Sequence, residues 1–401
     1  MASTCPHLFR KLSKITGGLS ERTHRIKKSK KLLTTLTVHN VLSGLKNVPI
    51  LNSYTTSLTS GISINSKSLS RVLEELQTPE ELFFYLLTSK CPSEEDLSEL
   101  KEGLHSKKDL PSETLDLLES IPSEFSSLQM YSLALMSLQS QSSFAKAYGK
   151  VPRKDLWIHA FEDALDILGK SPGILSYIYT KKLNKPWSDS DQNTLLRRFC
   201  ESSGVEESKF LKYFVGVFAE GGSGSVSSHA CKAIGSTLSD PYKAVSGGLN
   251  AMEGHLHARA IQDSLEWMLQ DSYRDSEAVE TPVPGFGHSV FKEDPRFKIL
   301  MKVLKQNYSE HDLYPVLESV VQGVPVVLRS KSKNCIPNGD LAAGVGLYMS
   351  GIEVKDMGPA LFGFSRSLGM LSNYILDRAC ELPIEYAESS DLQDLESIVK
   401  S

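Results

Sequence analysis

The sequence predicts an all-α protein, and three observations along its 401 residues lead to that prediction. Apolar residues recur at the helical spacing i, i+3, i+4, i+7 in most segments. Serine, threonine, proline and acidic residues stand together at the positions that begin helices. Strand signals are scarce, because only Thr34–Val38 and Asn52–Ser68 favour extended or loop structure.

The helices can be followed in chain order from residue 69. The segment Leu69–Leu76 places its apolar residues on one helix face. Thr78-Pro-Glu-Glu81 then provides an N-cap, a proline at the first helical position and a glutamate at the third, which begins a second helix. Further helix starts are predicted at Ser93, Ser112 and Ser123, and further apolar faces at Leu128, Tyr131, Leu135 and Leu138 and at Trp157, Phe161, Leu165 and Leu168.

The composition is that of a globular protein, with 40% hydrophobic and 23% charged residues. The formal net charge of -4 indicates no nucleic-acid partner and no membrane partner. No membrane span is expected, since even the apolar stretch Leu313–Leu328 contains Glu318, Gln322 and Pro325. The six cysteines are scattered without a C-x-x-C pair, which indicates reduced thiols in an intracellular compartment.

The two ends of the chain carry opposite charge. Residues 1–33 hold nine Lys/Arg and one acidic residue, which is typical of an organelle transit segment and equally of a solvated basic first helix. Both interpretations stay open at this point. At the other end, residues 381–401 are acidic, and their apolar residues predict a short amphipathic helix that is either solvated or a docking element.

A candidate site is the stretch Pro284–Arg296. Two glycines, Gly285 and Gly287, allow the backbone to approach a ligand closely, and His288 follows at once. Arg296 comes after a rigid Asp-Pro. An imidazole that transfers protons near neutral pH and a guanidinium that holds a carboxylate suit a small anionic carbonyl compound, although a plain surface turn has the same composition.

Two further segments carry ionisable residues beside chain breaks, Gly254–Arg259 with His257 and Pro337–Asp340. Brought together with His288, they would supply two imidazoles and one carboxylate, enough for proton abstraction next to a carbonyl. His255 and His257 could also be read as metal ligands. We expect no metal site, because no further cysteine, histidine or carboxylate completes the set.

Three other segments are candidates for binding anions. Arg366 lies within an apolar run, where a guanidinium needs a carboxylate or a bound anion to neutralise it. Lys331–Asn334 is a small cationic loop that suits phosphates or is merely solvated. Gly221–Ser225 lacks the spacing of known phosphate-binding loops and is more typical of a flexible turn.

These segments together resemble the citrate synthase family, and specifically its mitochondrial type. The resemblance extends from about Arg22 to Pro383, and its motifs occur in the family's order. They are Ser236-Thr-Leu-Ser-Asp-Pro-Tyr242, Gly254-x-Leu-His257, Pro284-Gly-Phe-Gly-His288, Asp294-Pro-Arg296, Pro337-Asn-x-Asp340 and Ser365-Arg-x-Leu-Gly369.

The resemblance implies a two-domain helical fold that forms a homodimer. The large domain would comprise residues 34–241 and 346–401 and the small domain residues 242–345, with residues 1–33 as a basic arm. The reaction implied is a Claisen condensation of acetyl-CoA with oxaloacetate followed by thioester hydrolysis, an acyltransferase activity. The mitochondrial matrix is the expected location, and the cytoplasm is the alternative.

The resemblance also implies roles for individual residues. Asp340 would remove the acetyl methyl proton, His257 would hydrogen-bond the enol, and His288 would polarise the ketone and protonate it. Arg296 and Arg366 would hold the oxaloacetate carboxylates. No cofactor and no metal is implied, since acetyl-CoA is a substrate. The residues implied to contact coenzyme A are Gly285, Phe286, Gly287, Lys331, Lys333, Asn334 and Arg153.

The chain departs from the family pattern at four places. Ala219–Ser225 lacks the family's oxaloacetate-binding histidine and carries extra small residues. His288 and Arg296 stand one residue closer than usual. Arg259 places a new cation beside the catalytic imidazole, and Tyr386 replaces the arginine that the family sends across the dimer interface.

Two hypotheses follow from the motifs and the departures. In the first, the protein is an active enzyme, a citrate synthase or a synthase for another 2-oxo acid such as a 2-methylcitrate synthase. In the second, it is a catalytically impaired paralogue that serves as a structural or regulatory dimer in a mitochondrial assembly. The retained Asp340, His257 and His288 favour the first, and the departures favour the second.

Overall fold

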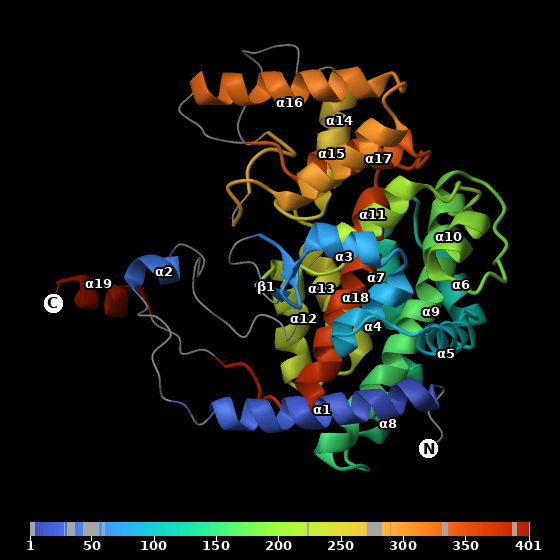
Figure 1. Ribbon diagram of the computed structural model, residues 1–401, viewed down its shortest axis with the longest axis vertical. Helices are drawn as coiled ribbons and strands as arrows, with labels where there is room; N and C mark the ends of the chain where they lie inside the picture. Colours follow the sequence, from blue (N-terminus) through green and yellow to red (C-terminus); the bar gives the residue numbers. More distant parts are fainter. Residues whose placement is uncertain are drawn as a thin grey trace.

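Helices make up nearly all of the regular structure, which confirms the all-α prediction (Figure 1). The computed structural model describes residues 5–27, 29, 37–42, 56–57, 61–222, 224–270, 283–288, 290–330, 336–386 and 391–400. Within this part of the chain the only sheet has three short antiparallel strands, β1 (Thr56–Ser57), β2 (Ser63–Ile64) and β3 (Lys67–Ser68). It lies inside the segment predicted to be extended, Asn52–Ser68.

The other prediction of extended or loop structure, Thr34–Val38, holds at Thr37 and is wrong at Val38. Val38 begins helix α2 (Val38–Leu42), and residues 34–36 lie outside the described residues. Thr37 and Asn40 explain the helix, because the Thr37 backbone N–H donates to Asn40 Oδ1 at 3.0 Å and the Asn40 N–H donates to Thr37 Oγ1 at 3.3 Å. This reciprocal capping outweighs the β-propensity of the flanking residues.

Most of the predicted helix starts are confirmed. Thr78 and Glu81 form a capping box at the start of α4 (Pro79–Thr88), and Ser93 and Asp96 form another at α5 (Glu94–His105). Helix α6 (Ser112–Ser120) begins at Ser112 itself. The start predicted at Ser123 is wrong.

Helix α7 (Ser127–Ser137) begins four residues later than that prediction, after the N-cap Ser126. Ser126 accepts a hydrogen bond from the Gln129 backbone, and the Gln129 side chain accepts one from the Ser126 backbone. A reciprocal box of this kind is a stronger start signal than a serine that follows a proline. The preceding residues form a turn, in which the Phe125 N–H donates to the Pro122 carbonyl.

Two long helices, α9 (Leu156–Lys182) and α18 (Met357–Ala379), form the centre of the larger part of the molecule (Figure 1). Every residue of α18 is buried, including Arg366 and Arg378, so any charge on it needs a partner or a ligand. The helices that surround this pair are α3 (Leu69–Glu75), α4, α5, α6, α7, α8 (Ser143–Ala147), α10 (Leu195–Ser203), α11 (Lys209–Phe218), α12 (Val226–Ser236) and α13 (Pro241–Met252), with short 3₁₀ turns at Leu138–Gln141 and Arg153–Asp155.

Four helices gather at one end of the molecule, above the buried α18 in Figure 1. They are α14 (Arg259–Leu269), α15 (Pro295–Asn307), α16 (Leu313–Ser330) and α17 (Gly339–Met349). Helix α17 packs against α14 and α15, whereas α13 packs against α12. None of the helices in the described ranges combines the length and the apolar character needed to cross a membrane.

The basic start of the chain forms a docked helix, α1 (Pro6–Lys27). Leu8 and Leu12 are fully buried, and the Phe9 ring stacks on Trp157 with centroids 5.4 Å apart. The Glu99 carboxylate accepts the backbone N–H groups of residues 7 and 8, both at 2.6 Å, and so caps the helix from outside. The acidic tail likewise contains the short helix expected there, α19 (Leu392–Lys400).

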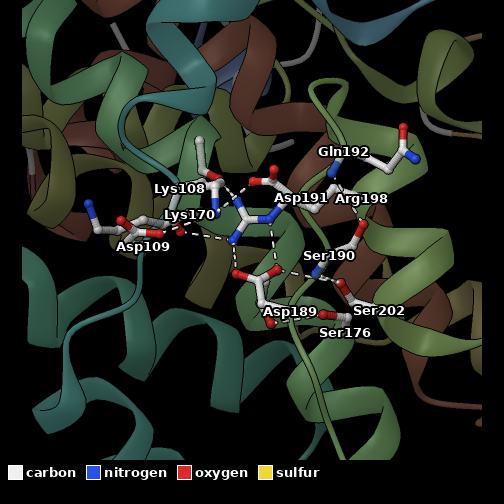
Figure 2. A network of polar contacts seen from close by, with 12 residues as sticks. Lys108, Asp109, Lys170, Ser176, Asp189, Ser190, Asp191, Gln192, Arg198 and Ser202 are labelled. Atoms are coloured by element: carbon white, nitrogen blue, oxygen red, sulfur yellow. Dashed lines mark hydrogen bonds and ion pairs between the residues drawn. The ribbon is translucent and has the colours of Figure 1, made fainter.

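A polar network around Arg198 ties the loop between α9 and α10 to the core (Figure 2). The Arg198 side chain is 2% exposed and donates from Nε to Asp189 Oδ1 at 2.8 Å. Its terminal nitrogens donate to the carbonyls of Gly169 at 2.5 Å and of Lys108 at 2.8 Å. A buried guanidinium is tolerated here because a carboxylate and two carbonyls satisfy it.

Candidate active site

The segments that contain His288 and Asp340 are joined through their backbones. Phe286 and Pro337 form an isolated antiparallel bridge. The Gly287 N–H donates to the Ile336 carbonyl at 2.7 Å, and the Asn338 N–H donates to the Gly285 carbonyl at 2.9 Å. The pairing fixes the residues just before His288 against the start of α17.

Glycine is required at position 285 of this pairing. Its φ is +79°, in the left-handed region, and a Cβ there would lie 2.7 Å from the Leu341 Cβ. Gly287 also has a positive φ, +86°. The two predicted glycines therefore serve the close approach of two chain segments, and the backbone of Gly285, Phe286 and Gly287 lies at the edge of the site.

Asp294 organises the next part of the site. Its carboxylate accepts from Arg296 Nε at 3.0 Å and Nη2 at 2.8 Å, and also accepts the Gly339 N–H at 2.8 Å. Asp294 is therefore shared between α15 and the start of α17. Arg296, which is 8% exposed, enters the site with its charge already balanced by one carboxylate.

The contacts of His288 determine its tautomer. Its Nδ1 accepts the backbone N–H groups of Val290 and Phe291, both at 3.0 Å. Burial and the Arg296 guanidinium lower the pKa of His288 to about 4, so the ring is neutral at pH 7. A neutral imidazole has one N–H, which must be on Nε2 when Nδ1 is an acceptor. His288 is therefore a hydrogen-bond donor through Nε2.

Asp340 occupies the first turn of α17, where Asn338 caps the helix by accepting the Asp340 N–H at 2.9 Å. Within the described part of the chain its carboxylate accepts no hydrogen bond. Burial raises the pKa of Asp340 from 3.8 to about 6, although Arg296 and Arg366 act in the opposite direction. A carboxylate with a pKa near neutrality is suited to act as a general base.

His257 is held through a hydroxyl that the sequence did not indicate. Its Nε2 lies 2.9 Å from Ser227 Oγ, at the start of α12. Burial, with the nearby charges of Arg366 and Arg296, lowers the pKa of His257 to about 3. His257 is therefore a neutral imidazole, as is His288, and the charge of Arg296 lowers the pKa of both.

Arg366 is buried in α18 and 2% exposed. Its Nε donates to the Phe218 carbonyl at 2.9 Å, and Nη1 donates to Ser225 Oγ at 2.8 Å. No carboxylate lies within 4.0 Å of it in the described residues. Burial lowers the pKa of Arg366 to about 10, which leaves it charged at pH 7. The site therefore contains one guanidinium without a direct ion pair, although the Glu220 and Asp340 carboxylates raise the pKa of Arg366 against the effect of burial.

Of the remaining candidates for coenzyme A contact, the structure describes only Arg153. Lys331, Lys333 and Asn334 lie outside the described residues. Arg153 donates to the carbonyl of Leu382, which follows the end of α18. Because α18 continues for 13 residues beyond Arg366, the end of the helix near Arg153 lies about 20 Å from Arg366 along the helix axis.

The structure also shows what occupies the positions that depart from the family pattern. Ala219 is fully buried, and Glu220 beside it accepts N–H groups from Gly221 at 3.0 Å and from the Asn373 side chain at 3.0 Å. Arg259 lies 3.5 Å from both Glu253 and Asp263. These two acids balance the charge of Arg259.

The arrangement supports a specific class of chemistry. It combines a base, Asp340, with two neutral imidazoles and an unpaired guanidinium, Arg366. A base next to a hydrogen-bond donor removes a proton beside a carbonyl and stabilises the enolate. A guanidinium without a carboxylate partner binds an anionic substrate.

Comparisons with known proteins agree with this chemistry. The family model described as citrate synthase, C-terminal domain, matches residues 44–383. The peroxisomal citrate synthase of Saccharomyces cerevisiae is 32% identical over 347 residues, covering 80% of this chain and 75% of that protein. The mitochondrial citrate synthase of the same yeast is 31% identical over 372 residues, covering 85% and 78%.

The fold is similar to that of a solved citrate synthase from Thermoplasma acidophilum, in a ternary complex with carboxymethyl coenzyme A and oxaloacetate. That structure has a TM-score of 0.75 and 20% sequence identity, and covers 88% of this chain and 96% of that chain. Since the family model covers most of the chain and the yeast relatives exceed 30% identity, the assignment rests on sequence as well as on fold. The chain belongs to the citrate synthase family, as a citrate synthase-like transferase.

Proposed function

We propose that the protein condenses acetyl-CoA with oxaloacetate and releases citrate and coenzyme A. The observation that carries the proposal is the backbone pairing of Phe286 with Pro337, which joins the segment that contains His288 to the segment that contains Asp340. The unpaired guanidinium of Arg366 nearby supplies a place for a carboxylate. Family membership supports the same reaction.

Each group has a defined part in the proposed reaction. Asp340 takes a proton from the acetyl methyl group, while His257 hydrogen-bonds the thioester oxygen as it becomes an enol. The enol carbon attacks the ketone carbon of oxaloacetate, and His288 passes its Nε2 proton to the ketone oxygen. Water then cleaves the thioester to give citrate and the free thiol.

Binding of the two substrates is proposed as follows. Arg366 holds one oxaloacetate carboxylate, and Arg296 approaches the other substrate oxygens with the part of its guanidinium that Asp294 leaves free. The backbone of Gly285–Gly287 and the side chains of Lys331, Lys333 and Asn334 contact coenzyme A. The proposed steps use side-chain acids, bases and donors, and require neither a cofactor nor a metal.

A homodimer is part of the proposal. Leu133 and Met136, on the outer side of α7, are each 39% exposed, and Tyr386 is 92% exposed. Large exposed apolar side chains on neighbouring turns of one helix, such as Leu133 and Met136 on α7, suit a self-complementary interface. Arg153, remote from the site of its own chain, would reach coenzyme A only in a second subunit.

The mitochondrial matrix is the proposed location, because similar proteins include the mitochondrial citrate synthases of Saccharomyces cerevisiae and Neurospora crassa.

The alternative proposal of an impaired paralogue in a mitochondrial assembly is favoured by two observations, the buried Ala219 in place of a histidine and Tyr386 in place of an arginine. The two proposals differ in turnover and are separated by a direct assay.

The assay measures release of coenzyme A thiol from acetyl-CoA that depends on oxaloacetate, with Asp340→Asn as the matched control. Asparagine keeps the shape of Asp340 and removes the base. Release that the substitution abolishes supports the enzyme, and a parallel assay with propionyl-CoA identifies a 2-methylcitrate synthase. No release from a folded protein at saturating substrates would refute the proposal in favour of the paralogue.

A further inference from the structure

Ser225 occupies the N-cap position of α12, but its hydroxyl does not cap the helix. Its φ of -66° and ψ of 136° are those of an N-cap residue, yet none of the described backbone N–H groups of α12 donates to its side chain. Serine at this position normally accepts such an N–H, as Ser93 and Ser126 do at the starts of α5 and α7. The Ser225 oxygen is therefore available for another contact.

The Ser225 hydroxyl points to the candidate active site instead. It accepts from Arg366 Nη1 at 2.8 Å and lies 3.2 Å from Ser227 Oγ. Ser227 is fully buried, and its Oγ lies 2.9 Å from His257 Nε2. Two serines thus connect the guanidinium proposed to bind a substrate carboxylate with the imidazole proposed to bind the enol.

Arg366 sets the direction of these hydrogen bonds. The guanidinium is charged at pH 7 and has only donors, so Ser225 Oγ must accept from it. The hydrogen of the Ser225 hydroxyl then needs an acceptor of its own. Among the described residues, the only other side chain in contact with this hydroxyl is Ser227. Ser225 therefore donates to Ser227.

The same reasoning fixes the hydrogen of Ser227. A hydroxyl has one hydrogen and two lone pairs. Ser227 Oγ accepts from Ser225 and, in a longer contact of 3.5 Å, from Arg366 Nη1. Its hydrogen is then donated to His257 Nε2. Because the His257 ring is neutral, an Nε2 that accepts leaves the ring hydrogen on Nδ1.

We propose that Ser225 is a positioning residue, which transmits the donor direction of Arg366 through Ser227 and so keeps the ring hydrogen of His257 on Nδ1. This inference rests on the proposed function, in which His257 donates a hydrogen bond to the thioester oxygen. Nδ1 has no partner among the described residues, so it is the nitrogen available to the substrate. Ser225 acts through Ser227 and not on the reacting atoms.

The position of the ring hydrogen tests the proposal directly. In Ser225→Ala, Ser227 can either donate to Nε2 or accept from an Nε2–H, so both tautomers become possible, each in about half of the molecules on the simplest count. NMR of the full-length protein labelled with ¹⁵N-histidine distinguishes a ring nitrogen that carries hydrogen from one that does not, and His257→Gln identifies the signals. We expect hydrogen on Nδ1 alone in the parent and on both nitrogens in Ser225→Ala. An Nε2–H in the parent, or an unchanged tautomer in the variant, would overturn the proposal.

Ser126→Ala is the matched control, because Ser126 is an N-cap serine that does cap its helix. Ser126→Ala should lower the Tm and leave the His257 tautomer unchanged, whereas Ser225→Ala should change the tautomer with a smaller loss of Tm. Ser225→Thr keeps a hydroxyl and should keep the Nδ1–H form. If Ser225→Ala fails to fold, Ser225→Gly decides, since glycine is tolerated at an N-cap and also lacks the hydroxyl.

Kinetics relate the tautomer to the reaction. The kcat of Ser225→Ala should fall about two- to tenfold with little change in the KM for acetyl-CoA, because part of the molecules lack the donor on Nδ1. Ser225→Thr should restore kcat. A fall in kcat without any change of tautomer would count against the proposal. A parent protein that does not condense acetyl-CoA would refute the proposed function, and the NMR result would still decide the role of Ser225.

Discussion

His288 Nε2 and Arg296 Nη2 lie 3.1 Å apart although each carries hydrogen. The His288 proton must be on Nε2 because Nδ1 accepts two backbone N–H groups. Two donors at hydrogen-bonding distance repel one another. An oxygen that accepts from both, such as the ketone or a carboxylate of a 2-oxo acid, would turn this repulsion into two hydrogen bonds.

Oxaloacetate should therefore protect the protein against heat better than succinate, which has the two carboxylates but no ketone. We expect oxaloacetate at millimolar concentration to raise the Tm, with a smaller effect of succinate, as measured by calorimetry. Arg366→Gln, which removes the unpaired guanidinium, should abolish the shift. Equal shifts with both acids would mean that His288 and Arg296 do not bind the ketone.

The rate of condensation should fall on the acid side with a single apparent pKa near 6. The base form of Asp340 is required, and the pKa of Asp340 is about 6 because of its burial. His257 and His288 have pKa values of about 3 and 4, so they stay neutral across this range. A plot of log kcat/KM against pH tests this, and a slope above one below pH 6 would contradict it.

Asp340→Asn should stabilise the fold at pH 8 while it removes activity. The native pKa of about 6 exceeds the ordinary 3.8, so the native state binds the proton more tightly than the unfolded state. Above pH 6 the ionised carboxylate costs the fold about 3 kcal/mol, and this cost disappears as the pH falls from 6 to 3.8.

Denaturant unfolding of the variant and the parent at pH 8 and pH 4.5 checks that expectation. The variant should be more stable by about 1–3 kcal/mol at pH 8, with a smaller advantage at pH 4.5. Asp116→Asn, on the exposed side of α6, is the control and should change stability at neither pH. A variant that is less stable at pH 8 would show that Asp340 has an unseen partner.

Local signals were predictable from the sequence and distant contacts were not. The Thr78–Glu81 capping box is complete within four residues, so the helix start was found. Asp294 and Gly339 are far apart in the chain and meet only after α15 and α17 pack together. Ser227 carries no signal of its own, because a serine at the start of a helix usually serves as a cap. The position of Arg153 relative to the site could not be predicted, because it depends on the direction in which the buried helix α18 runs.

The docking of α1 predicts that it stays on the mature protein. Leu8 is fully buried, so Leu8→Ala should cost about 2–5 kcal/mol of unfolding free energy. Lys14→Ala, on the exposed side of the same helix, should change it by less than about 0.5 kcal/mol. N-terminal sequencing of the native protein completes the test. A mature chain that begins after Lys27 would show that α1 is a cleaved transit segment.

Gly221→Ala should weaken oxaloacetate binding without unfolding the protein. A Cβ on Gly221 would lie 2.8 Å from both terminal nitrogens of Arg366. The guanidinium has little room to retreat, because its Nε is bonded to the Phe218 carbonyl and its carbon lies 5.0 Å from the centroid of the Phe362 ring. Gly221, unlike Gly222 with its φ of +68°, has no positive φ, so alanine fits the backbone.

The displaced guanidinium should lose at least one charge-assisted hydrogen bond to the substrate, which is worth about 1.5–3 kcal/mol. We therefore expect the KM for oxaloacetate to rise about 10- to 100-fold while the KM for acetyl-CoA changes little. Gly323→Ala, on α16, is the matched control, since a Cβ there meets no atom within 4 Å. An unchanged KM for oxaloacetate in Gly221→Ala would mean that the substrate carboxylate is bound by another group, because a methyl group at this position cannot leave Arg366 where it is.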